Sequence, residues 1–342
     1  MALRQRIDRR GVASGRAAVH VRTMRRRSFL IRAGAAAAAV GGGLWLKDHV
    51  LWRRPGLTFP SGGAGKWAPF ARRRALTPTV GMTAGGQAVD ALIDSGAQYS
   101  VMDRALFQRL SAAGALTSVF DMPLVAYGVG GQPQVGRGVT LDATVGGVRI
   151  ADLRAAILDL GPLADETGLG ASLILGQDVL SEAVLDLDLK ARRSRLVSPE
   201  SHVLSPALRP VAVRRSGTAL TGEVTVEGAV IRAVIDTGAS SLIALSRGAA
   251  EAAGLLDGRP ENESASIVLG GVARARVIQA RTVTFGDDLW REVATPVFAD
   301  APLPNYPDAL LGMEAFEGRE LALDLARGRL HVSPLMDLTV GL

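Results

Sequence analysis

The chain has no cysteine and only four histidines among its 342 residues. The absence of cysteine excludes disulfide bonds, thiol catalysis and zinc sites built on thiolates. The sequence also contains no His-Glu-x-x-His zinc motif and no Gly-x-Ser-x-Gly nucleophile elbow. We therefore expect no metal, no cofactor and no Ser-His-Asp chemistry. The four histidines are His20, His49, His202 and His331.

The net charge of +6 belongs to the N-terminus and not to the chain as a whole. Residues 1–54 carry a net charge of +11, which leaves about −5 for the remainder. A basic surface for nucleic acid would be expected within the folded part, whereas a basic N-terminus is typical of a targeting segment. The charge distribution predicts no nucleic-acid partner.

The N-terminal segment has the pattern of an export signal. Arg25-Arg26-Arg27-Ser28-Phe29-Leu30 precedes an Ala- and Gly-rich apolar run over residues 33–46. A basic stretch before such a run is typical of a secretory signal, and the twin arginines resemble the twin-arginine (Tat) export signal. The run is shorter than the ~20 residues of a spanning helix. We expect a periplasmic protein that contacts the membrane only through this leader, if the leader is not cleaved.

Other interpretations of the N-terminus stay open. The leader pattern fits best if translation begins at Met24, and the same residues are also consistent with a basic tail followed by a short helix. No clear cleavage site follows the apolar run. Residues 47–75 are rich in Arg, Pro, Gly and Trp, so we expect a linker with little regular structure, with a propeptide as the alternative.

Two stretches of the sequence repeat one pattern. Residues 91–97 and 233–239 each run from apolar residues to Asp, a small hydroxyl residue, Gly and Ala. An apolar run indicates a buried strand, and Asp-Ser/Thr-Gly is typical of a tight turn. Each copy should therefore present one carboxylate, that of Asp94 or Asp236, at the end of a buried strand.

The similarity continues downstream of both aspartates. The segment Leu173-Ile174-Leu175-Gly176 is matched by Ala309-Leu310-Leu311-Gly312, and Leu187-Asp188-Leu189 by Leu323-Asp324-Leu325. The offset is 142 residues between the aspartates and 136 between the glycines that close these segments. The chain therefore contains one domain design twice.

The repeated pattern resembles the retropepsin-like aspartic proteases, and most of all bacterial exported members of that family. The resemblance covers residues 76–335 and implies an all-β fold with short helices, in which two pseudo-symmetric lobes form one bilobal unit. Together with the N-terminal patterns, it gives the expected domains: a leader (1–46), a linker (47–75), an N-terminal lobe (76–200), an inter-lobe linker (201–209) and a C-terminal lobe (210–335).

The resemblance also implies roles for the residues of the two turns. Asp94 and Asp236 would form the catalytic dyad within one chain, so an active monomer is expected. Ser95 and Thr237 would lock the two turns together by hydrogen bonds, while Gly96 and Gly238 allow close backbone approach. Flaps would close over a protein or peptide substrate; the candidates are Tyr127, Gly128, Gly130 and Gly131 in the first lobe and Gly270 and Gly271 in the second.

Two carboxylates a few ångströms apart cannot both ionise at low cost, so one keeps its proton. The ionised member can activate a water and the protonated member can protonate the substrate carbonyl, which is general acid–base peptide hydrolysis. The alternatives are a catalytically silent protein that binds extended peptides in the inter-lobe cleft, lobes that each pair with another chain, and aspartates that only support their turns. The flap candidates are also consistent with plain surface hairpins.

The local patterns predict further elements and one difference between the lobes. Hairpins are expected around Gly85-Gly86 and Glu227-Gly228, and short helices over residues 102–113 and 246–254. Asp186 and Asp188 alternate in an apolar strand and are expected to be solvent-facing or structural. Ser100 follows Asp94 by six residues, whereas Leu242 follows Asp236, so the halves need not bind substrate alike.

Overall fold

A computed structural model describes most of the chain beyond the basic N-terminus. The predicted leader lies outside the described residues, as do the flap candidates Tyr127, Gly128, Gly130, Gly131 and Gly270. In the part of the chain that is described, no helix is long and apolar enough to cross a membrane. The described residues are 52–72, 75–126, 134–165, 168–268, 271–298 and 307–335.

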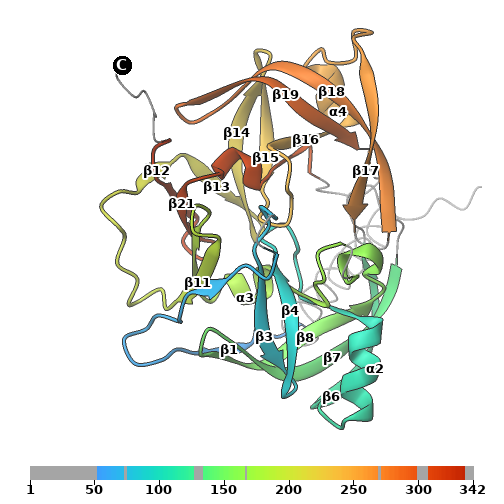
Figure 1. Ribbon diagram of the computed structural model, residues 1–342, viewed down its shortest axis with the longest axis vertical. Helices are drawn as coiled ribbons and strands as arrows, with labels where there is room; N and C mark the ends of the chain where they lie inside the picture. Colours follow the sequence, from blue (N-terminus) through green and yellow to red (C-terminus); the bar gives the residue numbers. More distant parts are fainter. Residues whose placement is uncertain are drawn as a thin grey trace, which may run out of the picture. The chain divides into compact units, whose positions relative to one another are not determined.

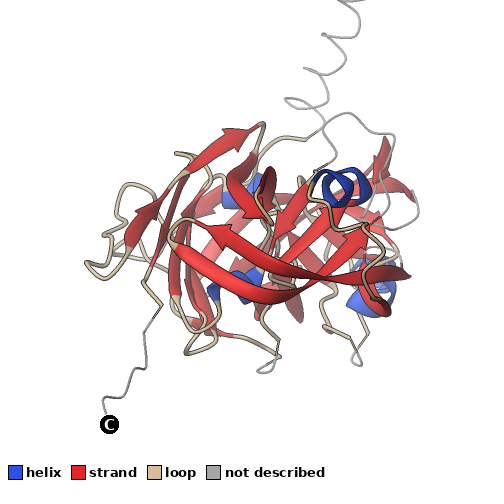
Figure 2. Ribbon diagram, turned by 90° about the horizontal axis from the view of Figure 1, so that it is seen from above, coloured by secondary structure: helices blue, strands red, loops and turns tan. Residues whose placement is uncertain are grey.

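Strands make up most of the described chain, and the helices are few and short (Figure 2). Two eight-stranded sheets form the two lobes, and a six-stranded sheet connects them. In Figure 1 the N-terminal lobe, coloured blue to green, lies below the C-terminal lobe, coloured yellow to orange. The architecture confirms the predicted all-β fold with two retropepsin-like lobes.

The N-terminal lobe has the strand order β1-β8-β5-β9-β4-β3-β7-β6. Its helices are α2 (Arg104–Ala112), η2 (Gly161–Leu163), which is a 3₁₀ helix, and α3 (Gln177–Leu180). Its strands are β1 (Gly56–Thr58), β3 (Thr79–Ala84), β4 (Gln87–Ile93), β5 (Val101–Asp103), β6 (Ser118–Ala126), β7 (Gln134–Val145), β8 (Val148–Leu158) and β9 (Leu173–Leu175).

The C-terminal lobe repeats this plan with the order β13-β14-β15-β20-β16-β19-β18-β17. Its helices are α4 (Arg247–Ala252) and the 3₁₀ helix η3 (Met313–Phe316). Its strands are β13 (Val213–Ser216), β14 (Ala219–Val226), β15 (Ala229–Ile235), β16 (Ile243–Ser246), β17 (Glu261–Val268), β18 (Gly271–Phe285), β19 (Asp288–Phe298) and β20 (Ala309–Leu311).

The connecting sheet has the order β12-β22-β21-β10-β11-β2. At its centre β10 of the first repeat pairs antiparallel with β21 of the second, with Leu185 opposite Leu323. Both leucines are buried, so this strand pair joins the apolar cores of the two lobes. Its strands are β2 (Ala68–Pro69), β10 (Val184–Asp188), β11 (Arg193–Val197), β12 (Arg209–Val211), β21 (Glu320–Asp324) and β22 (Arg329–Val332).

The described part of the segment over residues 47–75 has little regular structure, as expected, with only two short strands, β1 and β2. Strand β1 pairs with β8 in the N-terminal lobe, and β2 pairs with β11 in the connecting sheet. Phe70 is 3% exposed and forms a bridge to Val80. No sequence pattern indicated these pairings, because edge pairing satisfies the backbone of a Gly- and Pro-rich segment without any hydrophobic periodicity. The predicted domain boundaries themselves stay predictions.

The strands that lead to the two aspartates end in buried residues because they lie inside their sheets, with a neighbouring strand on each side. Strand β4 pairs in parallel with β9, with Ile93 opposite Leu175, and β15 pairs in the same way with β20, with Ile235 opposite Leu311. All four side chains are at most 1% exposed. Strand ends covered on both faces are expected to be apolar, which agrees with the apolar residues just before each aspartate, whereas the earlier part of β15 exposes Val230 and Arg232.

The predicted helices and hairpins occur close to their expected places. Helix α2 begins after Asp103, whose carboxylate accepts a hydrogen bond from the backbone N–H of Ala105, and α4 begins after Ser246, which caps Ala249 in the same way. Two long hairpins, β6–β7 and β17–β18, stand where flaps were predicted. Of the flap candidates only Gly271 is described; it opens β18, opposite Val268. The flap role stays a prediction.

Candidate active site

The two aspartates stand in turns of the same geometry. The backbone N–H of Asp94 donates to the Leu175 carbonyl at 2.9 Å, and that of Asp236 donates to Leu311 at the same distance. The backbone N–H groups of Gly96 and Gly238 each donate at 2.8 Å to Oδ1 of the aspartate two residues earlier. Each carboxylate is therefore fixed by its own turn.

Ser95 and Thr237 lock the two turns together across the lobe junction. Ser95 Oγ donates to the Ile235 carbonyl at 2.7 Å, and Thr237 Oγ1 donates to the Ile93 carbonyl at 2.7 Å. Each hydroxyl oxygen also accepts the backbone N–H of the other residue, at 2.9 Å for Ser95 N and 3.0 Å for Thr237 N. Both side chains are 1% exposed. Because all four bonds are buried, they hold the lobes in one register.

Glycine follows each hydroxyl residue because the opposite carboxyl group lies directly against it. A Cβ on Gly96 would stand 2.6 Å from Cγ of Asp236, and a Cβ on Gly238 would stand 2.6 Å from Cγ of Asp94. No side chain fits at such a distance. The two glycines thus allow the carboxyl groups to approach each other from opposite lobes.

The two carboxyl groups share a hydrogen bond, and their ionisation is linked. Burial raises the pKa of Asp236 well above its ordinary value, and the charge of Asp94 and the shared hydrogen bond raise it further. Burial also raises the pKa of Asp94, but the shared hydrogen bond and the N–H groups of Gly96 and Ala97 oppose the rise. The pair can hold one proton and one negative charge.

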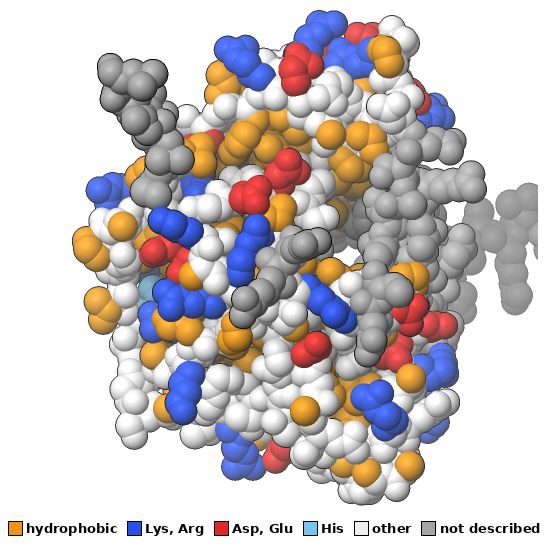
Figure 3. Space-filling view, viewed as in Figure 1, with side chains coloured by type: hydrophobic (Ala, Val, Ile, Leu, Met, Phe, Trp, Pro, Cys, Tyr) orange, Lys and Arg blue, Asp and Glu red, His pale blue; other side chains and the backbone are white. Residues whose placement is uncertain are grey.

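The site is open to solvent on one side. Asp94 is half-buried and Gly96 is exposed, whereas Asp236 is 8% exposed. Figure 3 shows a band of hydrophobic side chains on the C-terminal lobe, beside the hollow where the lobes meet.

One family model, described as Aspartyl protease, matches residues 80–179 and 222–315, which are more than half of the chain. The chain belongs to this aspartyl protease family. The matched ranges include both aspartate turns and most of both lobe sheets. The match confirms the family inferred from the repeated motif.

The solved structures that are similar to this family member include the following two. A retropepsin-like aspartic protease from Rickettsia conorii is 22% identical, with a TM-score of 0.28, over 36% of this chain and 89% of the other. Basic 7S globulin from soybean is 9% identical, with a TM-score of 0.42, over 82% of this chain and 95% of the other. A search of curated proteins found no match.

A second glycine of each repeat packs against the aspartate turn. A Cβ on Gly176 would stand 2.8 Å from the Ala97 carbonyl, and one on Gly312 would stand 2.6 Å from the Ala239 carbonyl. The next residue then donates its backbone N–H to that carbonyl at 2.8 Å in both lobes. In this family member the segment that follows β9 or β20 thus packs against the aspartate turn and donates a backbone hydrogen bond to it.

The difference between Ser100 and Leu242 is balanced by a second difference. Ser100 Oγ donates to Asp178 at 2.8 Å and accepts the Gly176 N–H at 3.1 Å. The second lobe has leucine in place of the serine, and Glu314 accepts the backbone N–H of Leu242 at 2.9 Å, just as Asp178 accepts the backbone N–H of Ser100 at 3.0 Å. Both arrangements fix the strand after the aspartate turn with an acidic side chain, and the expectation that the halves need not bind substrate alike stays a prediction.

Sequence reasoning missed one polar residue at the site, Gln177. It directly follows Gly176, is 3% exposed, and donates to the backbone carbonyl of Ser95. The signal was present in the sequence, since the matched segments read Gly-Gln-Asp in one repeat and Gly-Met-Glu in the other. A polar residue that replaces an apolar one at an equivalent buried position is expected to have a partner.

Asp186 and Asp188 lie away from the site and are structural. Asp186 pairs with Arg195 and His202, each at 2.9 Å, and Asp188 pairs with Arg193 at 2.9 Å. Both aspartates are less than 9% exposed, so the solvent-facing alternative was wrong. Within the described ranges no group of three or more metal-binding side chains was found.

Proposed function

We propose that this aspartyl protease family member is an aspartic endopeptidase whose dyad is Asp94 and Asp236. One observation carries the proposal. The two carboxyl groups come from opposite lobes of one chain, share a hydrogen bond, and have raised pKa values because they are buried together. Two carboxyl groups that share one proton are suited to acid and base roles in the same reaction.

In the proposed mechanism Asp94 is the base and Asp236 is the acid. Asp236 is the less exposed of the two groups, and burial favours the neutral form of a carboxyl group, so in this proposal it holds the proton. Asp94 takes a proton from a water molecule, and the resulting hydroxide attacks the scissile carbonyl carbon while Asp236 donates its proton to the carbonyl oxygen. Collapse of the tetrahedral intermediate breaks the C–N bond, with the leaving amine taking the proton held by Asp94 and the hydroxyl proton returning to Asp236.

The substrate would be a protein or peptide in extended conformation between the lobes. Main-chain hydrogen bonds to strand-like segments would hold it, as in strand addition. In this proposal the hairpins β6–β7 and β17–β18, which occupy the predicted flap positions of the sequence, would cover it.

The proposal is tested by peptide cleavage from pH 3 to 8, using the full chain and a diverse peptide library. Asp94→Asn and Asp236→Asn should each abolish cleavage, because neither role is filled by an amide. Asp90→Asn is the control: it makes the same chemical change on the same strand, four residues from Asp94, and should leave cleavage intact. If the wild type retains peptides without cutting them, the peptide-binding alternative replaces this one.

We also propose that the protein is exported and acts as a monomer. The basic and apolar leader pattern supports export, and the dyad within one chain removes the need for a second copy. Cell fractionation of a C-terminally tagged chain tests the first point, because full recovery in the cytoplasm would contradict it. Light scattering on the active fraction tests the second.

A further inference from the structure

A polar side chain and an apolar one occupy equivalent positions directly beneath the two aspartate turns, at Gln177 and its counterpart Met313. Both residues follow the packing glycine, and both donate a backbone N–H at 2.8 Å to the aspartate turn, to Ala97 and Ala239 respectively. Both side chains are buried, at 3% and 0% exposed. Only the glutamine carries a group that can donate or accept a further hydrogen bond.

The chemistry of its neighbours fixes how the Gln177 amide is oriented. The backbone carbonyl of Ser95 can only accept, so the amide nitrogen must face it; the distance is 2.7 Å. The amide oxygen then faces the hydroxyl of Thr218, which donates to it. Thr218 lies in the turn between β13 and β14, so this bond comes from the opposite lobe. Both ends of the side chain are therefore held.

The peptide group that Gln177 contacts is the one that contacts the catalytic carboxylate. The carbonyl of Ser95 and the N–H of Gly96 belong to a single peptide unit, and that N–H donates to Asp94 Oδ1 at 2.8 Å. A hydrogen bond to the carbonyl end polarises the unit and strengthens the N–H as a donor. A relay of three hydrogen bonds thus runs from Thr218 through Gln177 to Asp94.

The second lobe has the same peptide geometry without the relay. Gly238 N–H donates to Asp236 Oδ1 at 2.8 Å, but Met313 has no hydrogen to donate to the carbonyl of the Thr237–Gly238 peptide. The difference favours negative charge on Asp94 over Asp236, in the same direction as the difference in their exposure.

We propose that Gln177, oriented by Thr218, is a positioning residue that makes Asp94 the base of the dyad by strengthening the Gly96 hydrogen bond to its carboxylate. This inference rests on the proposed peptidase function. It deepens that function, because it says which aspartate activates the water and which side chain breaks the symmetry of the duplicated site.

The test is the pH profile of kcat/KM for the full chain and Gln177→Met, which installs the residue of the second lobe. Loss of the relay should make Asp94 harder to ionise, so the acidic limb should move to higher pH and kcat/KM below the optimum should fall roughly threefold. KM should change little, because Gln177 lies beneath the turn and not in the cleft. Thr218→Val should shift the acidic limb in the same direction by less.

The controls separate positioning from packing. Met313→Leu alters the equivalent buried position without changing a hydrogen bond, and should leave both limbs in place. A uniform loss of activity in Gln177→Met without movement of the acidic limb would overturn the inference, since a purely structural role predicts that result. If Gln177→Met does not fold, Thr218→Val decides the question by the same criterion.

A readout without catalysis distinguishes failure of this inference from failure of the proposed function. The carboxyl carbon of Asp94 can be followed by ¹³C NMR during a pH titration, with Asp94→Asn used for assignment. If the wild type cleaves nothing but the Asp94 titration moves to higher pH in Gln177→Met, the peptidase proposal fails and the relay stands. If the titration does not move, the relay is wrong whatever the activity.

Discussion

In the N-terminal lobe the turn between β3 and β4 is Gly85-Gly86, whereas the C-terminal lobe has Glu227-Gly228 between β14 and β15. The first residue has positive φ in both, 53° for Gly85 and 47° for Glu227. A Cβ on Gly85 would stand 2.9 Å from the Ala115 carbonyl. The N-terminal lobe therefore excludes a side chain where the C-terminal lobe carries one.

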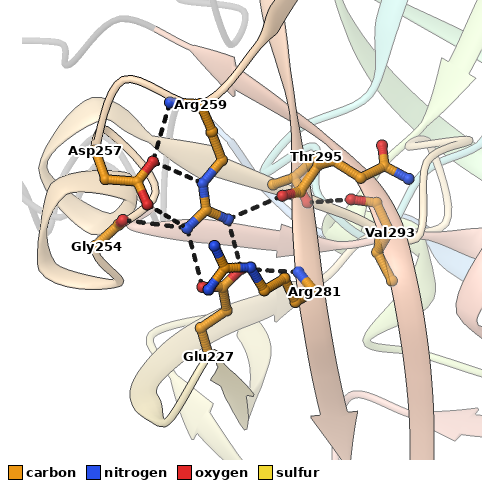
Figure 4. A network of polar contacts seen from close by, with 8 residues as sticks. Glu227, Gly254, Asp257, Arg259, Arg281, Val293 and Thr295 are labelled. Atoms are coloured by element: carbon orange, nitrogen blue, oxygen red, sulfur yellow. Dashed lines mark hydrogen bonds and ion pairs between the residues drawn. The ribbon is translucent and has the colours of Figure 1, made fainter.

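The C-terminal lobe uses that side chain to hold its turn. Arg259 pairs with Glu227 at 2.6 Å and with Asp257 at 2.8 Å, and the Arg281 backbone N–H donates to Glu227 at 2.7 Å (Figure 4). A non-glycine residue at positive φ costs about 1–2 kcal/mol, which this network offsets.

The comparison shows where the duplicated design is free to change. Away from the junction, the turn at Gly85 packs closely against Ala115 in the first lobe, whereas the equivalent turn at Glu227 is held by an ion-pair network in the second. At the junction, the hydroxyl residue and the glycine after each aspartate are kept in both lobes, because each makes a contact to the opposite aspartate turn.

The largest effect should come from the glycines at the junction. Gly96→Ala and Gly238→Ala should each lower kcat/KM at least about 100-fold, because the added methyl displaces the opposite carboxyl group. Gly56→Ala, where nothing lies within 4 Å, is the control and should retain activity. An effect confined to one of the two junction glycines would show that the lobes do not contribute equally.

Substitutions of the two hydroxyl residues at the junction should have the next largest effect, which should be on stability. Ser95→Ala and Thr237→Ala should each lower the free energy of unfolding by about 2–4 kcal/mol, since each leaves a buried carbonyl and a buried N–H without their partner. Thr237→Ser copies the first lobe and should cost about 1 kcal/mol or less. Urea unfolding measures all three, and equal costs for Thr237→Ser and Thr237→Ala would rule out the hydrogen-bond account.

The glycine turn of the first lobe offers a matched pair of substitutions. Gly85→Ala meets both positive φ and the Ala115 carbonyl, so it should destabilise by about 2–3 kcal/mol. Gly86→Ala meets positive φ alone, with nothing within 4 Å, and should cost about 1–2 kcal/mol. Thermal unfolding of both variants gives the difference; no difference would mean that packing against Ala115 does not constrain this turn.

A substitution in the ion-pair network of the second lobe should have the smallest effect on stability, and this effect should depend on pH. The hydrogen bond from Arg259 is the main cause that lowers the pKa of Glu227. A lowered pKa in the folded state adds stability above the unfolded pKa, and this stability is lost as pH falls through the folded value. Glu227→Gln should therefore cost about 1 kcal/mol at pH 7 and progressively less in acid. A cost that does not change with pH would contradict this origin.

The elements that the sequence predicted best are those defined locally. The apolar runs ending at Ile93 and Ile235, the glycine turns and the short helices each depend on neighbouring residues. The connecting sheet was not predicted, because β2, β11 and β12 are short and pair with strands distant in the chain. No local pattern specifies such partners.

The candidate site shows the same limit. The paired aspartates and their hydroxyl and glycine neighbours follow from a repeated motif, so the residues could be named before the structure. Gln177 could not be connected with Thr218, because these residues are 41 positions apart and come from different lobes. Only the folded arrangement shows that one lobe reaches beneath the aspartate turn of the other.

The central claim is that one chain supplies both members of the dyad. The most direct test is peptide cleavage by Asp94→Asn and Asp236→Asn separately and by their equimolar mixture, refolded together from denaturant. A dyad within one chain predicts that the mixture is as inactive as each variant alone, because no chain then holds both carboxyl groups. Activity regained in the mixture would contradict the claim and show that lobes of different chains pair to form the site.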